Sequence, residues 1–301
     1  MSSVPNLQRS SASFVINVSV TVAAFGLAPF LKKSVLTNGT SPWMVALVSA
    51  IAAAIFGLLI AAREEPHVLR RLIAPRNVRA LAPIGILATG IVTLLVALAL
   101  TTTTATNRSL FQAAYPTATL LFAHLLLGER LRLTQYACIG LISLGLLLMN
   151  AGNGGVRFGP GFWLLLATLP LIGLSDVYGK RLTAQMPTTL IACGRNVYGA
   201  LFVAAVALFL DLGPWPGLTD LALLITAGIC QAVGIWTLYR AFELDKASLV
   251  SSLVATAPLV TASLEWFLLT LALGPLQWAA VVLVTAAAIL LAQTAANGRS
   301  D

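Results

Sequence analysis

Ten apolar runs, each long enough to cross a lipid bilayer as a helix, follow one another along the chain with short connections between them. They cover approximately residues 14–36, 42–62, 81–101, 105–127, 132–150, 161–182, 189–210, 219–241, 247–270 and 276–295. A spanning helix needs about 20 apolar residues, whereas the strands of a membrane β-barrel alternate over about 10. Because 58% of the residues are hydrophobic and only 9% are charged, little chain remains for a soluble domain. We predict an all-α integral membrane protein with ten transmembrane helices.

The formal charge of +8 could suggest nucleic acid, but most basic residues gather in connections on one side of the predicted spans. With the N-terminus in the cytoplasm, thirteen lie in internal segments: Arg9, Arg63, Arg70, Arg71, Arg76, Arg79, Arg130, Arg132, Lys180, Arg181, Arg240, Lys246 and Arg299. Four lie in external segments: Lys32, Lys33, Arg108 and Arg157. This asymmetry predicts cytoplasmic termini in a bacterial inner membrane, with lipids as neighbours and no nucleic-acid partner.

The two halves of the chain repeat each other. A shift of 142 residues places Pro116 on Pro258, and a shift of 147 places the Gly26-Leu27 pair on Gly173-Leu174 and Lys33 on Lys180. Five helices per half is an odd number, so the second half would start on the opposite side of the membrane. We predict two inverted repeats, residues 1–155 and 156–301, an arrangement typical of secondary transporters.

At these residues the chain resembles the EamA-type members of the drug/metabolite transporter superfamily, over about residues 14–295. The most specific residues are Tyr115-Pro116, Leu127-Gly128-Glu129-Arg130-Leu131, Gln135, Gly140, Ala257-Pro258 and Gln277. Within that group the chain looks like YddG-type exporters of aromatic and other, mostly neutral, amino acids. The resemblance implies a central cavity surrounded by helices of both halves, and transport by alternating access. A drug or other metabolite exporter of the same fold is the alternative, and a channel is the rival from another class.

Prolines in the middle of the fourth and ninth apolar runs suggest where a substrate binds. Proline removes a backbone donor, so Pro116 and Pro258 are expected to free the carbonyls of Gln112 and Val254 near the membrane midplane. An amino acid needs polar partners for its two charged groups and an apolar wall for its side chain. The predicted substrate-binding residues are Gln112, Tyr115, Trp163, Tyr178, Gln231 and Trp236. A belt of aromatic residues at the membrane surface is the competing interpretation of the tryptophans.

Ionisable residues inside a predicted span are candidates for a gate or for ion coupling. Asp176 stands four residues before Lys180, a spacing that favours a helical ion pair, and Arg195 is a second possible partner. Glu265 has no basic residue within a turn, so it is expected to face a watery cavity or the interface. Structural salt bridges and helix-end lysines would explain the same residues without a transport role.

Nothing in the sequence points to an enzyme, a cofactor or a metal. The glycine-rich stretch 152–161 lacks the Gly-Lys-Ser/Thr of a phosphate-binding loop. The two histidines have no metalloprotease spacing, and Cys138, Cys193 and Cys230 fall in three different runs without metal-type spacing. The expected partners are small-molecule substrates and lipids, and a monomer is compatible with the sequence.

Overall fold

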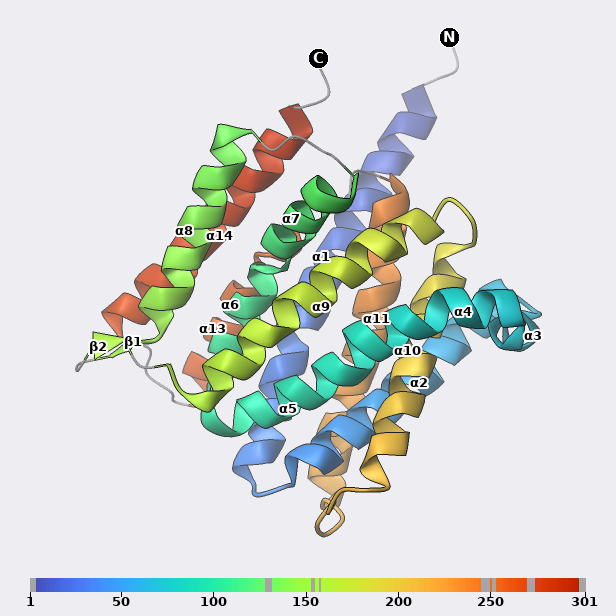
Figure 1. The fold of residues 1–301 in the computed structure, drawn as a ribbon, viewed down its shortest axis with the longest axis horizontal. Helices are drawn as coiled ribbons and strands as arrows, with labels where there is room; N and C mark the ends of the chain where they lie inside the picture. The colour runs from blue at the N-terminus through green and yellow to red at the C-terminus, as the bar shows by residue number, and fades with distance from the viewer. Residues whose placement is uncertain are drawn as a thin grey trace.

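The computed structural model is a bundle of helices (Figure 1), and it describes residues 4–127, 132–152, 155–156, 158–244, 250, 253–269 and 274–297. The helices of the first part are α1 (Val4–Thr37), α2 (Pro42–Glu64), α3 (Val68–Ile73), α4 (Pro75–Ile84), the π-helical segment η1 (Gly85–Ile91), α5 (Val92–Thr102), α6 (Ala105–Ala113), α7 (Tyr115–Leu127) and α8 (Leu133–Met149). Those that follow are α9 (Pro160–Leu182), α10 (Thr188–Ala207), α11 (Leu218–Leu244), α13 (Ala257–Leu268) and α14 (Pro275–Asn297). Strands β1 (Ala151–Gly152) and β2 (Gly155–Val156) form a small antiparallel pair.

Among the described residues, six helical segments are long and apolar enough to cross a membrane. They are Ala12–Thr37, Pro42–Glu64, Pro75–Thr102, Pro160–Leu182, Thr188–Ala207 and Leu218–Leu244. The third is one continuous helical span made of α4, η1 and α5. Shorter apolar helices occupy the fifth, ninth and tenth predicted runs, and the fourth run is divided into α6 and α7. The protein is therefore a multi-pass membrane protein whose described spans are helices.

Two helices are interrupted where the sequence places its repeat-related prolines. Helix α6 ends at Ala113, a turn at Ala114 follows, and α7 begins with Tyr115-Pro116. Helix α13 begins with Ala257-Pro258 after a turn at Thr256. Each turn is closed in the same way, because the N–H of Thr117 donates to the carbonyl of Ala114 and that of Leu259 to Thr256. Proline lacks the N–H that a continuous helix would use here, so both helices break.

Corresponding helices of the two parts make corresponding contacts. Helix α1 packs against α11 and α13, and α9 packs against α5 and α7. Helix α2 contacts α10 and α11, and α10 contacts η1. Helices α8 and α14 pack against each other and lie together at one edge of the bundle (Figure 1). The start of α1 and the end of α14 lie at the same end of the bundle (Figure 1), which we call the terminal end. The opposite end is called the distal end.

Two glycines let helices approach closely at related positions. A Cβ on Gly26 of α1 would lie 2.6 Å from the Cβ of Val260 in α13, and one on Gly173 of α9 would lie 2.8 Å from the Cβ of Ala118 in α7. Both distances are shorter than real side chains allow, so only glycine fits these crossings. Under the two sequence shifts, Gly26 corresponds to Gly173 and Ala118 to Val260.

Candidate functional site

A cavity of about 120 Å³ lies inside the bundle. Its lining comes from eight helical elements, α1, η1, α5, α6, α7, α9, α10 and α11, and from Val254. The volume is sufficient for several water-sized groups. Most lining side chains are apolar, but the set also contains Lys32, Arg108, Asp176 and Arg195. Charged groups inside a membrane bundle mark binding sites and transport pathways.

Arg108 stands in the second turn of α6, and its side chain is 8% exposed. Its guanidinium carbon lies 5.4 Å from the centre of the Tyr115 ring, which is near enough for a cation–π contact. Its Nε and Nη1 atoms are buried and have no hydrogen-bond partner among the described residues. The guanidinium therefore presents unused donors within the cavity wall.

Lys32 of α1 is 6% exposed, and its Nζ donates to Oε1 of Gln231 in α11 at 3.2 Å. Lys32 and Arg108 carry like charges and line the same cavity. Both line the distal half of the cavity, since Lys32 is near the end of α1 and Arg108 near the start of α6.

Asp176 of α9 and Arg195 of α10 form a buried ion pair, with Oδ1 and Nη1 at 3.2 Å. Arg195 also donates from Nη1 to the hydroxyl of Tyr239 at 3.4 Å. The pair connects two helices of the second part at the cavity wall, nearer the terminal end. A buried carboxylate with such a partner is neutralised without help from a ligand.

Five of the residues predicted to bind substrate, to interrupt a helix or to form a gate line the cavity: Gln112, Tyr115, Pro116, Asp176 and Gln231. Tyr115 also contacts α9, because its hydroxyl lies 3.4 Å from Oγ1 of Thr168. Val254, named for its carbonyl, is in the lining as well. The interruption of the fourth run at Pro116 thus borders the cavity directly.

The other predicted aromatic residues lie elsewhere. Trp163 is 57% exposed and packs edge-on against Phe162 at the distal start of α9, while Tyr178 is 38% exposed. Trp236 lies beneath Arg240, whose guanidinium carbon is 4.6 Å from the ring centre. None of the three is among the residues that line the cavity. Their helices do border the cavity, but these side chains occupy other helix faces.

The prediction that Glu265 faces a watery cavity or the membrane interface is wrong. Its side chain is fully buried, and Oε1 accepts from the N–H of Ala105 at 2.7 Å. Oε2 accepts from the N–H of Thr106 at 2.7 Å and from its hydroxyl at 2.5 Å. Because the first N–H groups of a helix have no partner within it, an anion is stabilised there, and this carboxylate caps α6.

The helical ion pair expected from the spacing of Asp176 and Lys180 is replaced by other contacts. Asp176 pairs with Arg195, and Nζ of Lys180 donates to the carbonyl of Phe242 near the end of α11 at 3.1 Å. The related Lys33 donates to the carbonyl of Leu100 near the end of α5 at 2.7 Å. A cation is favourable at a helix C-terminus. Pro258 is buried in α13, outside the cavity lining.

Sequence reasoning missed Lys32 and Arg108 because it placed both in external segments. A signal for Arg108 was present, since the shift of 142 sets it opposite Val250. A charged residue that departs from the repeat within an apolar run is a candidate for a binding role.

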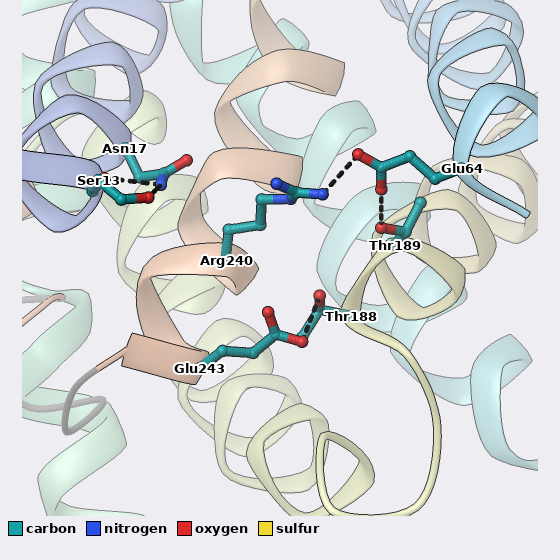
Figure 2. Close-up of polar contacts among 7 residues, drawn as sticks. All are labelled: Ser13, Asn17, Glu64, Thr188, Thr189, Arg240 and Glu243. Atoms are coloured by element: carbon teal, nitrogen blue, oxygen red, sulfur yellow. Dashed lines mark hydrogen bonds and ion pairs between the residues drawn. The ribbon is translucent and has the colours of Figure 1, made fainter. Parts of the chain in front are cut away.

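A polar network at the terminal end joins helices from both parts of the chain (Figure 2). Arg240 of α11 donates from Nη2 to Oε1 of Glu64 in α2 at 2.5 Å, and the hydroxyl of Thr189 in α10 donates to the other oxygen of Glu64. Beside it, the hydroxyl of Thr188 donates to Oε1 of Glu243 at 2.8 Å. The network therefore links α2, α10 and α11 at one end of the bundle.

A multi-pass helical bundle around a charged internal cavity has the architecture of a membrane transporter. The chain belongs to the EamA-like transporter family, whose model matches residues 12–151 and again 159–293. Members of this family move small molecules across membranes and are not enzymes.

The other comparisons support the fold but identify no substrate. A solved structure described only as the crystal structure of a protein matches 94% of this chain and 99% of its own, with a TM-score of 0.70 and 19% identity. At that identity the likeness shows a shared fold. A search of curated proteins finds no match. The family match is to EamA-like transporters as a whole and does not identify a subfamily.

Proposed function

We propose that this protein is a secondary transporter that exports amino acids from the cytoplasm across the bacterial inner membrane by alternating access. The observation that carries the proposal is the central cavity, which is lined by both parts of the chain and bordered by the broken helix at Pro116. Carriers place their substrate near the midplane, where interrupted helices expose polar backbone groups. The two parts are residues 1–155 and 156–301, with both termini in the cytoplasm.

Related contacts support two inverted repeats. The pair Gly26–Val260 corresponds to Gly173–Ala118, and the lysine contacts at Leu100 and Phe242 correspond under the same two shifts. Lys33 and Leu100 lie toward the distal end, whereas Lys180 and Phe242 lie toward the terminal end. Related contacts at opposite ends are what an inverted repeat produces.

The polar lining supports an amino acid more than a cationic drug. Arg108 and Lys32 can bind a carboxylate, and Tyr115 and the apolar lining can contact a side chain. A cationic drug would have to approach these two positive charges. That repulsion makes the drug exporter the less favoured alternative.

The Glu64–Arg240 ion pair supports a gate at the terminal end. It joins α2 of the first part to α11 of the second, so movement of one part against the other would separate it. At the distal end, the Glu265 contacts with Ala105 and Thr106 also join the two parts. In alternating access, one of these connections would open at a time.

Counterflow in proteoliposomes tests the proposal. Vesicles loaded with unlabelled amino acid should accumulate the labelled compound transiently and with saturation, because a carrier exchanges one molecule for another. Gln112→Ala should raise the half-saturation concentration, whereas Gln293→Ala, on the exposed face of α14, should not. A flux without saturation or counterflow would favour a channel and refute the carrier.

A further inference from the structure

We propose that the transported substrate carries a net negative charge, and that Arg108 and Lys32 bind its carboxylate or phosphate group. This rests on the proposed transport function and narrows the substrate of the same cavity to an acid that has a second negative group. The shared chemistry is an oxyanion with several hydrogen-bond acceptors. Carboxylate and phosphate groups both have it.

The charges of the lining do not balance. Its charged side chains are three cations and one carboxylate. Asp176 is engaged by Arg195, which leaves Lys32 and Arg108 without an acidic partner among the described residues. A membrane-embedded cavity with two uncompensated cations is costly to maintain. An anionic ligand would remove that imbalance.

Arg108 has the donors that such a ligand requires. It is more than nine-tenths buried, Nε and Nη1 are unpaired, and its planar group lies over Tyr115. A guanidinium presents N–H groups in a fork that matches the two oxygens of a carboxylate or phosphate. The acid nearest the start of α6 is Glu265, and both of its oxygens already accept bonds from Ala105 and Thr106. The free donors of Arg108 therefore remain for a ligand.

Lys32 completes the pair from another helix. Its ammonium has three donors, and its hydrogen bond within the described part of the chain is to Oε1 of Gln231, a neutral acceptor. Because Lys32 and Arg108 carry like charges and line the same cavity, an anion bound there would be attracted by both and would reduce their mutual repulsion. A neutral amino acid also brings an ammonium group, and the lining carboxylate is already occupied by Arg195. An acid with a second negative group fits the cavity better.

The internal repeat distinguishes Arg108 and Lys32 from residues that occur in both halves and make related structural contacts. Under the two shifts, Arg108 corresponds to Val250 and Lys32 to Gly179. The scaffold lysines Lys33 and Lys180, by contrast, correspond to each other and make related contacts. The cavity cations, unlike the scaffold lysines, are therefore not shared by the two halves, which is consistent with a role in binding.

Ligand-induced stabilisation of the purified full-length protein in detergent tests binding without requiring transport. At matched ionic strength, we expect succinate, a dicarboxylate, or glycerol phosphate to raise the unfolding temperature, and phenylalanine and ethidium to raise it much less. The anion that raises the unfolding temperature more identifies the carboxylate or the phosphate as the preferred group. Arg108→Gln and Lys32→Gln should each weaken anion binding at least tenfold.

Two variants control for folding and for charge. Arg108→Lys keeps the positive charge and should retain part of the affinity. Lys33→Gln removes the neighbouring charge on the same helix, but that side chain caps α5 and is outside the cavity lining, so anion affinity should be unchanged. If either glutamine variant fails to fold, the ranking of ligands on the unaltered protein decides the question.

Counterflow with the same four compounds separates this inference from the proposed function. Equal or better binding of phenylalanine or ethidium, or unchanged anion affinity in Arg108→Gln, would overturn the inference even if counterflow persists. Selective anion binding that disappears in Arg108→Gln would support it, even if no compound shows counterflow and the transport proposal fails.

Discussion

Replacing Glu265 should destabilise the protein by an amount set by the donors that lose their acceptor. In Glu265→Ala the N–H groups of Ala105 and Thr106 remain buried without a partner. Each unsatisfied buried group costs about 1–3 kcal/mol, so the expected loss is about 2–6 kcal/mol. Glu265→Gln keeps one carbonyl acceptor and should cost about 1–3 kcal/mol. Thr106→Val removes only the hydroxyl contact and should cost about 1 kcal/mol.

Equilibrium unfolding in mixed micelles with increasing SDS, followed by tryptophan fluorescence, gives these free energies. Glu265→Ala should be the most destabilised variant, Glu265→Gln the next and Thr106→Val the least. Thr106→Val should add less in the Glu265→Ala background than alone, because its hydroxyl has then lost its acceptor. Additive effects, or wild-type stability in Glu265→Ala, would refute the assignment of Glu265 as the cap of α6. The three donors give the Glu265 carboxylate a structural role as the cap of α6. We therefore also expect Glu265→Gln to retain substrate exchange.

Three further predictions concern the site and the topology. Pro116→Ala and Pro258→Ala should each lower counterflow more than folded yield, because a restored backbone bond straightens a broken helix; unchanged counterflow in both would make the breaks packing features. Tyr115→Ala should raise the half-saturation concentration about 5- to 150-fold, equivalent to about 1–3 kcal/mol, while Trp163→Ala changes it little; the reverse order in a concentration series would place the substrate at Trp163 and not in the cavity. A cysteine added after the last residue, in a background lacking the native cysteines, should react only with membrane-permeant reagents, and labelling of intact cells by an impermeant reagent would contradict cytoplasmic termini.

The order of the helices was predictable because the length of each apolar run can be read directly from the sequence. The breaks at Pro116 and Pro258 were predictable for a similar reason, since proline acts on its own backbone. The chain also indicated Gln112 and Gln231 as cavity residues, because a polar side chain within an apolar run has few other places to go. These inferences depend on local chemistry.

Residues whose roles depend on helix rotation or distant partners were not predictable. Trp163 and Tyr178 lie on cavity-bordering α9, but a helix that is apolar on every side gives no sign of which face turns inward. The acceptor role of Glu265 depends on α6, 160 residues away in sequence, and it appears only when the helices are packed. Arg108 was misplaced because a basic residue near a helix end resembles a loop residue.

The π-helical segment η1 determines the register of the third span. A π-helix closes its hydrogen bonds over one more residue than an α-helix, and each α-helical residue turns the chain by about 100°. On the near side of η1, Gly85 lies against Tyr198 of α10, where a Cβ would be 2.7 Å from the Tyr198 Cβ. On its far side, Val92, Thr93 and Val96 face the cavity. A single-residue deletion within η1 that restored α-helical winding would keep the first contact and turn that lining away, so the composition of this wall is decided by a backbone insertion as much as by its side chains.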